Sequence, residues 1–193
     1  MLGTREAPHT RATLVVGLYG ALALLGLLVS AGRGDADVYR LDETRAAWWL
    51  GASVIAGLAL GLATILATRV AIARFAWGAA LQRDFHAMLG DLSNREIWIL
   101  AVASAIGEEL LFRGALLPWL GLWPQAILFG ALHIGPRRRH LVWTAWAVGM
   151  GLGFGVLTQA TGDLGGAIVA HFTINFVNLR VIVRSEVGAP RAA

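Results

Sequence analysis

The sequence contains no cysteine and no lysine, and it has few charged residues of any kind. Without cysteine, neither a disulfide framework nor a thiolate nucleophile is available. Without lysine, all sixteen basic positions are arginine, which we attribute to a GC-rich genome rather than to mechanism. Charged residues make up 15% of the 193 positions and hydrophobic residues 57%, a balance that soluble domains do not have. The composition therefore predicts a membrane protein.

Several apolar runs approach the roughly 20 residues that a helix needs to cross the hydrocarbon core of a bilayer. Six membrane segments are predicted, at 12–31, 46–68, 97–120, 123–136, 141–160 and 164–184. The fourth run has about 14 residues, so it is too short to span alone and is expected to lie buried among the other helices.

Residues 70–92 differ from these runs, because apolar side chains gather on one helical face and charged ones interrupt the rest. The apolar face holds Leu81, Phe85, Met88, Leu89 and Leu92. This pattern predicts an amphipathic helix at the membrane interface. The expected fold is therefore all-α: a polytopic membrane helix bundle of about six transmembrane helices plus an interfacial amphipathic helix. Residues 1–193 are expected to form a single membrane domain.

The first apolar run has features that a secretory signal peptide also has. Arg5 and Arg11 precede it, and it ends in Val29-Ser30-Ala31. However, the run is longer than the usual 7 to 15 apolar residues, and further spans follow it. We therefore favour an uncleaved first helix.

The distribution of arginine predicts the orientation of the chain. With the N-terminus inside, only Arg33, Arg40 and Arg45 fall on the outer side. Twelve arginines fall on the inner side: Arg5, Arg11, Arg69, Arg74, Arg83, Arg95, Arg137, Arg138, Arg139, Arg180, Arg184 and Arg191. Because basic residues collect in cytoplasmic loops, both termini are expected on the cytoplasmic side of the membrane. The membrane itself is expected to be a bacterial inner membrane. The same distribution explains the net charge of +4 without nucleic acid as a partner.

The stretch IGEELLFRG, residues 106–114, places three charges inside the third apolar run. Ser93 and Glu96 form a capping box that begins this helix, so Glu108 lies near the bilayer midplane. Glu109 and Arg113 are four residues apart with the acid first, the favourable order for an ion pair. A structural role alone would explain that pair. Glu108 points about 100° away and has no partner in its own helix, so it is the candidate working acid.

Two further runs carry polar side chains at membrane depth. His133 lies in the fourth run, one turn after Phe129, and His171 lies in the sixth, one turn before Asn175. A single histidine in a helix bundle is more often a packed, hydrogen-bonded residue than a catalyst. The coincidence of an unpaired glutamate, two histidines and an asparagine instead indicates a shared polar cavity.

These residues resemble three motifs of the CPBP family, the CAAX-protease and bacteriocin-processing (Abi) intramembrane endopeptidases. The three motifs are Glu108-Glu109-x-x-x-Arg113, Phe129-x-x-x-His133 and His171-x-x-x-Asn175, in family order. The resemblance covers residues of about 93 to 180, so the motif-bearing catalytic core is placed at 93–184. The first ninety residues carry no motif.

The resemblance implies a glutamic-type intramembrane protease. Glu108 and His133 would activate a water molecule for attack on the scissile carbonyl, and His171 and Asn175 would stabilise the oxyanion. Glu109 and Arg113 would orient the site. The residue types suit these roles. Two histidines and a glutamate are also a possible zinc set, but HExxH is absent, so a site without metal or cofactor is favoured.

The expected partners are the lipid bilayer and a membrane-anchored protein or peptide substrate; no oligomeric state is predicted. Family members cleave prenylated C-termini, process peptides, confer bacteriocin immunity or trim C-terminal sorting anchors, and a GC-rich bacterium favours a peptide or a C-terminal anchor. Two alternatives remain: a proton-coupled transporter, which would normally show internal repeats, and a non-catalytic immunity or scaffold protein. The site is expected to open to the cytoplasmic half, with Arg137–Arg139 at its rim attracting acidic substrate ends.

Overall fold

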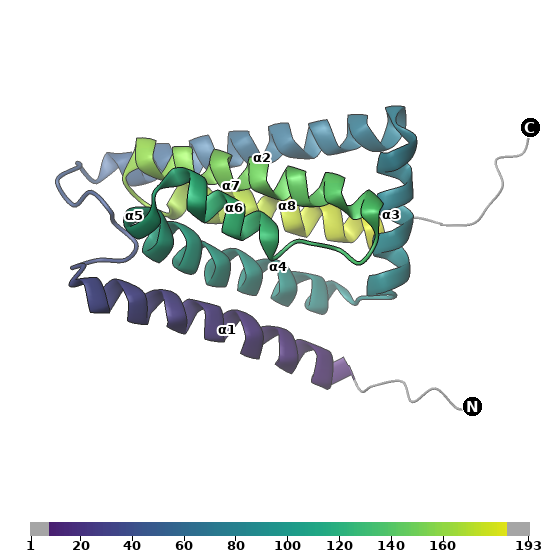
Figure 1. Cartoon of the computed structure of the whole chain (residues 1–193), viewed down its shortest axis with the longest axis horizontal. Helices are drawn as coiled ribbons and strands as arrows, with labels where there is room; N and C mark the ends of the chain where they lie inside the picture. The colour runs from purple at the N-terminus through teal and green to yellow at the C-terminus, as the bar shows by residue number, and fades with distance from the viewer. Residues whose placement is uncertain (1–7, 185–193) are drawn as a thin grey trace, which may run out of the picture.

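The computed structural model describes residues 8–184 and shows an almost wholly helical molecule (Figure 1). Within that range, strand-like pairing is limited to an isolated bridge between Arg40 and Asp163. The predicted all-α membrane helix bundle is therefore confirmed. Arg5 and Arg191, which contribute to the arginine count, lie outside the described residues.

Four of the predicted spans are helices that are long and apolar enough to cross a membrane. They are α1 (Pro8–Arg33), α2 (Trp48–Arg74), α7 (Leu141–Thr161) and α8 (Gly165–Arg184). Their outward side chains are largely exposed leucine, isoleucine and valine, as expected of surfaces that face lipid.

The third predicted span is not one uniform helix. The Ser93–Glu96 capping box is present and begins α4 (Asn94–Glu109), as predicted. The helix then widens into a π-helical stretch, η1 (Leu110–Leu116), before the short α5 (Leu117–Leu120). A π-helix is rare, and it occurs frequently at functional sites because the inserted residue changes the direction of the side chains around it. Here the change falls between the two glutamates and Arg113.

The fourth predicted span is only partly helical. The helix α6 runs from Leu122 to Ala131, so the prediction of a helix to residue 136 is wrong at its C-terminal end. Residues 132–137 leave the helix and cross to the end of the bundle as irregular backbone (Figure 1). Irregular backbone at membrane depth is tolerated where it is buried in protein or lines a water-filled space. His133 lies at the start of this segment.

The predicted interfacial helix is α3 (Ala76–Leu89), which lies across one end of the bundle (Figure 1). It is shorter than the predicted 70–92, because α2 continues to Arg74 and the chain turns sharply at Phe75. The start of α1 and the end of α8 lie at this same end (Figure 1). There Arg184 donates to the Asn94 side chain at 2.7 Å. Both described ends of the chain therefore lie on one side of the bundle.

Asp84 in α3 binds the segment that follows His133. Its carboxylate accepts hydrogen bonds from Arg137 at 2.9 Å and Arg139 at 2.5 Å, and it lies 3.0 Å from His140 Nε2. Partial burial opposes ionisation of this carboxyl, but the hydrogen bonds from Arg139 and His140 and the nearby positive charges outweigh it. The pKa of Asp84 therefore lies below its usual range. Arg137 and Arg139 are therefore engaged with α3, and the place of Arg137–Arg139 at the rim of the site stays a prediction.

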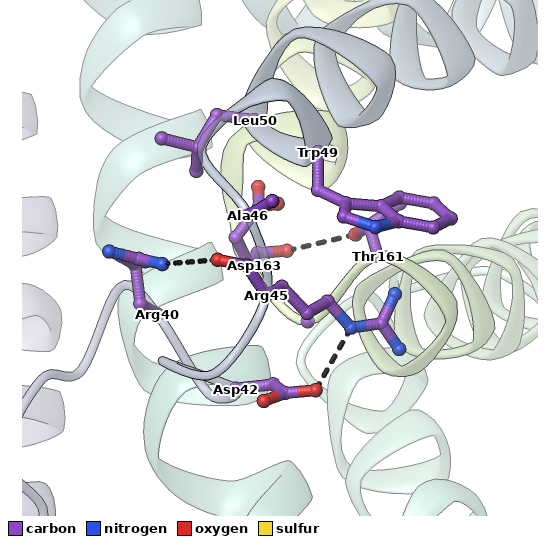
Figure 2. A pocket seen from close by; sticks show the side chains of 9 residues that line it. Arg40, Asp42, Arg45, Ala46, Trp49, Leu50, Thr161 and Asp163 are labelled. Atoms are coloured by element: carbon purple, nitrogen blue, oxygen red, sulfur yellow. Dashed lines mark hydrogen bonds and ion pairs between the residues drawn. The ribbon is translucent and has the colours of Figure 1, made fainter.

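The loop between α1 and α2 is fastened to the turn between α7 and α8 (Figure 2). Asp42 N donates to the Gly162 carbonyl at 3.0 Å, and the Arg45 side chain donates to Asp42 Oδ2, also at 3.0 Å. Asp163 Oδ1 then accepts from Gly165 N at 2.7 Å, which satisfies one of the free amides at the start of α8. These contacts fix the height at which α8 starts, and with it the depth of His171.

The helices that carry the site approach one another closely. A Cβ atom on Gly57 of α2 would lie 2.0 Å from the carbonyl oxygen of Gly166 in α8. The two backbones are therefore in contact, and Gly166 N donates to Ser53 Oγ of α2 at 2.8 Å. Small residues at such crossings let membrane helices pack by van der Waals contact. This contact holds α8 in place beside α2, while α4 packs on another side of α8.

Candidate intramembrane active site

Glu109, Arg113 and His171 form a buried hydrogen-bonded group between α4, η1 and α8. Arg113 Nη1 lies 2.9 Å from Glu109 Oε1, and neither side chain is exposed. The predicted ion pair is therefore confirmed. His171 Nδ1 lies 2.7 Å from the same Oε1 atom. Because an ionised carboxylate can only accept, Nδ1 carries the proton in this contact. Glu109 thus binds Arg113 and at the same time orients the His171 ring.

The Arg113 guanidinium is surrounded by aromatic rings as well as by its carboxylate. Its Cζ atom lies 4.4 Å from the ring centre of Phe129, 5.1 Å from Phe154 and 5.9 Å from Phe112. Cation–π attraction of this kind is strongest where water is excluded. Arg113 also donates to the Gly151 carbonyl of α7 at 3.4 Å. The arginine therefore ties η1 to α6 and α7.

Glu108 is buried but lacks the ion pair that Glu109 has. Its Oε2 atom lies 3.8 Å from His171 Nε2, beyond hydrogen-bond length, and has no hydrogen-bond partner among the described residues. Helix α1 passes close by, because a Cβ atom on Gly107, the residue before Glu108, would lie 2.5 Å from the Tyr19 carbonyl oxygen. His171 thus lies between the two glutamates, with Nδ1 on one and Nε2 facing the other. The two acids therefore differ in their partners, and the role of Glu108 as the working acid stays a prediction.

His133 reaches the group through an aromatic ring rather than by direct contact with Glu108. Its Nδ1 atom lies 2.7 Å from the Phe129 carbonyl one turn earlier, and a carbonyl only accepts, so Nδ1 is the donor. In the neutral ring, Nε2 then keeps its lone pair. The Phe129 ring lies 4.7 Å from the His133 ring and 6.1 Å from the His171 ring. Phe129 therefore separates the two histidines and contacts both.

Asn175 lies one turn below His171 on α8, as predicted, and its side chain is bound to α4. Asn175 Nδ2 donates to Ser104 Oγ at 3.0 Å. Ser104 is buried and lies four residues before Glu108, on the same face of α4. An asparagine amide has two N–H donors, so this bond leaves the second one available.

The structure thus brings Glu108, Glu109, Arg113 and His171 into one group. It places Asn175 one turn away and His133 on the far side of the Phe129 ring. Within residues 8–184, no three histidine, aspartate or glutamate side chains are arranged to hold a metal ion.

Sequence reasoning missed two polar residues that take part. Ser104 holds Asn175, and Gln125 of α6 donates to the Gly151 carbonyl at 3.0 Å beside Arg113. Each is a single polar side chain in an otherwise apolar run, which is a detectable signal. For Ser104 there was a second signal, because it lies four residues before Glu108 and so on the same face of the helix.

Fold and site together define a class of protein: a helical membrane bundle with a buried acid, histidine and arginine group between its helices. The comparisons with known proteins then show which family part of the chain resembles. Residues 93–177 match the family described as "Type II CAAX prenyl endopeptidase Rce1-like". This segment is similar to that family, in agreement with the resemblance drawn from the three motifs.

One curated relative is the "Uncharacterized protein YpbD" of Bacillus subtilis (strain 168), which is 36% identical over 83 residues. The match covers 42% of this chain and 42% of the relative, so less than half of that protein is matched. No solved structure matches the chain significantly. The matched family segment contains α4, η1, α5, α6 and α7 and most of α8; α1, α2 and α3 lie outside it.

Breaking the buried pair tests its structural role. Glu109→Gln or Arg113→Met alone should lower the free energy of unfolding by about 3–5 kcal/mol, because each leaves one uncompensated buried charge. The double variant should recover part of the loss, although the charged partner of His171 stays removed. Thermal unfolding in detergent measures this effect. The half-exposed Asp42–Arg45 pair is the control, and Asp42→Asn should cost no more than about 1 kcal/mol. Strictly additive losses in the Glu109/Arg113 double variant would contradict the pairing.

Proposed function

We propose that the protein is an intramembrane endopeptidase of the glutamic type, which hydrolyses a peptide bond in a membrane-associated substrate. The observation that carries this proposal is the difference between the two adjacent glutamates. Glu109 is neutralised by Arg113, whereas Glu108 lies 3.8 Å from His171 Nε2 with an unpartnered oxygen. A buried carboxylate with a free lone pair is suited to accept a proton from water.

The two histidines suit different steps. His133 keeps the Nε2 lone pair in its neutral form, so it can act with Glu108 as a general base on the attacking water. His171 is held by Glu109 through Nδ1, which aims Nε2 toward Glu108. An imidazolium at His171 would bring the group of two carboxylates and one guanidinium to neutrality. It would also make Nε2 a donor for the oxyanion.

Asn175 supplies the second donor in this proposal. Ser104 accepts one of its amide hydrogens and thereby fixes the plane of the amide. The remaining hydrogen can donate to the oxygen that becomes negative when water adds to the carbonyl. The general base then returns its proton to the leaving amine, which completes hydrolysis.

The substrate we propose is a bacterial membrane-anchored peptide or a C-terminal protein anchor. The site lies inside a helical bundle, so a substrate held in the same bilayer reaches it without leaving the membrane. The irregular segment 132–137 leads from the end of α6 toward the α3 end of the bundle. We place the entrance there, facing the cytoplasm in the orientation that the arginine distribution predicts.

Replacing the working acid tests the mechanism. Glu108→Gln should lower cleavage by about 10² to 10⁴-fold, the range expected when a general base is removed. Purified protein in liposomes would be incubated with a library of single-span peptides, and the products identified by mass spectrometry. Glu43→Gln, the same change at an exposed loop position, is the matched control and should cleave normally. Normal cleavage by Glu108→Gln would exclude this mechanism.

Removal of metal tests the glutamic assignment. Glu109 is engaged by Arg113, which makes it a poor metal ligand, so we expect turnover to survive treatment with strong chelators. Elemental analysis of the purified protein is the direct measurement. One tightly bound zinc ion per chain, required for turnover, would overturn the assignment.

Single cysteines test orientation and access, because the native chain has none. Asp91→Cys, between α3 and α4, should react with a membrane-impermeant thiol reagent added from the cytoplasmic side. Glu43→Cys, in the α1–α2 loop, should react from the opposite side. Ile134→Cys, beside His133, should follow Asp91→Cys if the entrance faces the cytoplasm. Labelling of Ile134→Cys only from the Glu43 side would contradict the proposed entrance.

A further inference from the structure

His133, which acts as a general base in the proposed function, lies outside any regular helix. The helix α6 ends at Ala131, and residues 132–137 are irregular backbone. A regular helix fixes the direction of its side chains, whereas irregular backbone does so only where other elements hold it. A base must be held closely, because a displacement of about 1 Å can cost on the order of 10²-fold in rate. One contact comes from α7, where the Thr144 hydroxyl donates to the His133 carbonyl at 3.0 Å.

The far end of the irregular segment is held by Asp84 of α3. Arg137 and Arg139 donate to this carboxylate, and His140 Nε2 lies 3.0 Å from its Oδ2 atom. The His140 ring is buried and packs directly over the segment, because a Cβ atom on Gly135 would lie 2.2 Å from His140 Nδ1. One carboxylate of α3 therefore fixes the place where the segment ends and the ring that covers it.

The His133 ring itself is held by two aromatic side chains. The Phe129 carbonyl accepts from its Nδ1 atom, and the Phe129 ring lies 4.7 Å away. Trp143 of α7 meets the His133 ring in a T-shaped contact at 5.2 Å. Phe85, which follows Asp84 in α3, meets the same Trp143 ring in a second T-shaped contact at 4.9 Å. The helix α3 therefore reaches the His133 ring through a single intervening side chain.

We propose that α3 positions His133 for proton transfer, with Asp84 and Phe85 as the positioning residues. Asp84 sets the path of the irregular segment, and Phe85 sets the Trp143 ring against which the His133 ring lies. This inference rests on the proposed function, because it concerns a base of the same reaction. It extends that function by giving a role to a helix that lies outside the family-matched segment and across one end of the bundle (Figure 1).

The helix α3 also contacts the end of α8, where His86 Nδ1 lies 2.8 Å from the Ile182 carbonyl. Ile182 lies about three turns beyond His171 on the same helix. A change in α3 that disturbed the whole site would therefore displace His171 as well. Positioning through the irregular segment predicts instead that His133 alone is displaced, so His171 is the internal reference.

The kinetic test compares Asp84→Asn with Asp91→Asn, the same change at an exposed aspartate just after α3. With a peptide cleaved from the single-span library, Asp84→Asn should lower kcat by about 10- to 100-fold and leave KM little changed, because the substrate still binds while the base is displaced. Asp84→Glu, which keeps the carboxylate, should recover most of the loss. Asp91→Asn should match the wild type. An unchanged kcat in Asp84→Asn, an effect on KM alone, or faster turnover would overturn the proposal.

Two milder variants test the same contacts. Because the Arg139 side chain is 45% exposed, Arg139→Gln should fold even if Asp84→Asn does not. It should lower kcat in the same direction, and the two losses combined should be less than additive, because both changes break one contact. Phe85→Leu should also lower kcat, whereas Phe75→Leu, at an exposed ring just before α3, should not. Wild-type kcat in both Arg139→Gln and Phe85→Leu would contradict the positioning role.

A chemical measurement without substrate separates this inference from the proposed function. Diethyl pyrocarbonate modifies histidine nitrogens, and mass spectrometry gives the rate at each residue. In Asp84→Asn and Phe85→Leu, His133 should react several-fold faster than in the wild type, because its segment opens more often. His171, held by Glu109, should react at the wild-type rate. If the rates change in this way while the wild type cleaves no peptide, the positioning stands and the proposed function fails. An unchanged rate at His133, or an equal increase at His171, would refute the positioning whatever the activity.

Discussion

The buried guanidinium of Arg113 is the constraint on which the rest of the site depends. A charge this deep must be neutralised within the protein, and Glu109, three aromatic rings and the Gly151 carbonyl together do so. Satisfying Arg113 therefore fixes the positions of η1, α6 and α7 relative to one another. It also occupies Glu109, and this makes the two neighbouring glutamates chemically different.

Departures from regular helix occur around the same group. The π-helical stretch η1 begins at Leu110, directly after the two glutamates, and the irregular segment 132–137 begins next to His133. The irregular segment would be costly in lipid, because its backbone groups lack regular helical partners. The π-helical stretch instead keeps its backbone groups paired, through i→i+5 hydrogen bonds. Both departures lie beside side chains of the candidate site.

The α1–α2 loop and the helix α3 position the site from its two ends. At one end, the loop before α2 holds the turn where α8 begins, and so sets the depth of His171. At the other, Asp84 of α3 binds the arginines that follow the His133 segment. Charges that sequence reasoning assigned to membrane orientation therefore also have local partners. The two roles are compatible, because an arginine paired at the interface still counts toward the orientation of the chain.

The sequence alone determined the class of fold and the local pairs. Apolar length predicts spans, and a spacing of four predicts the Glu109–Arg113 pair, because both depend on neighbours along one helix. The motif order likewise identified the family segment. Only the tertiary structure decided that α6 ends at Ala131 and that His171 lies between two glutamates. The His171–Glu109 contact joins residues 62 positions apart. Its geometry follows from helix packing, which no spacing within a single helix encodes.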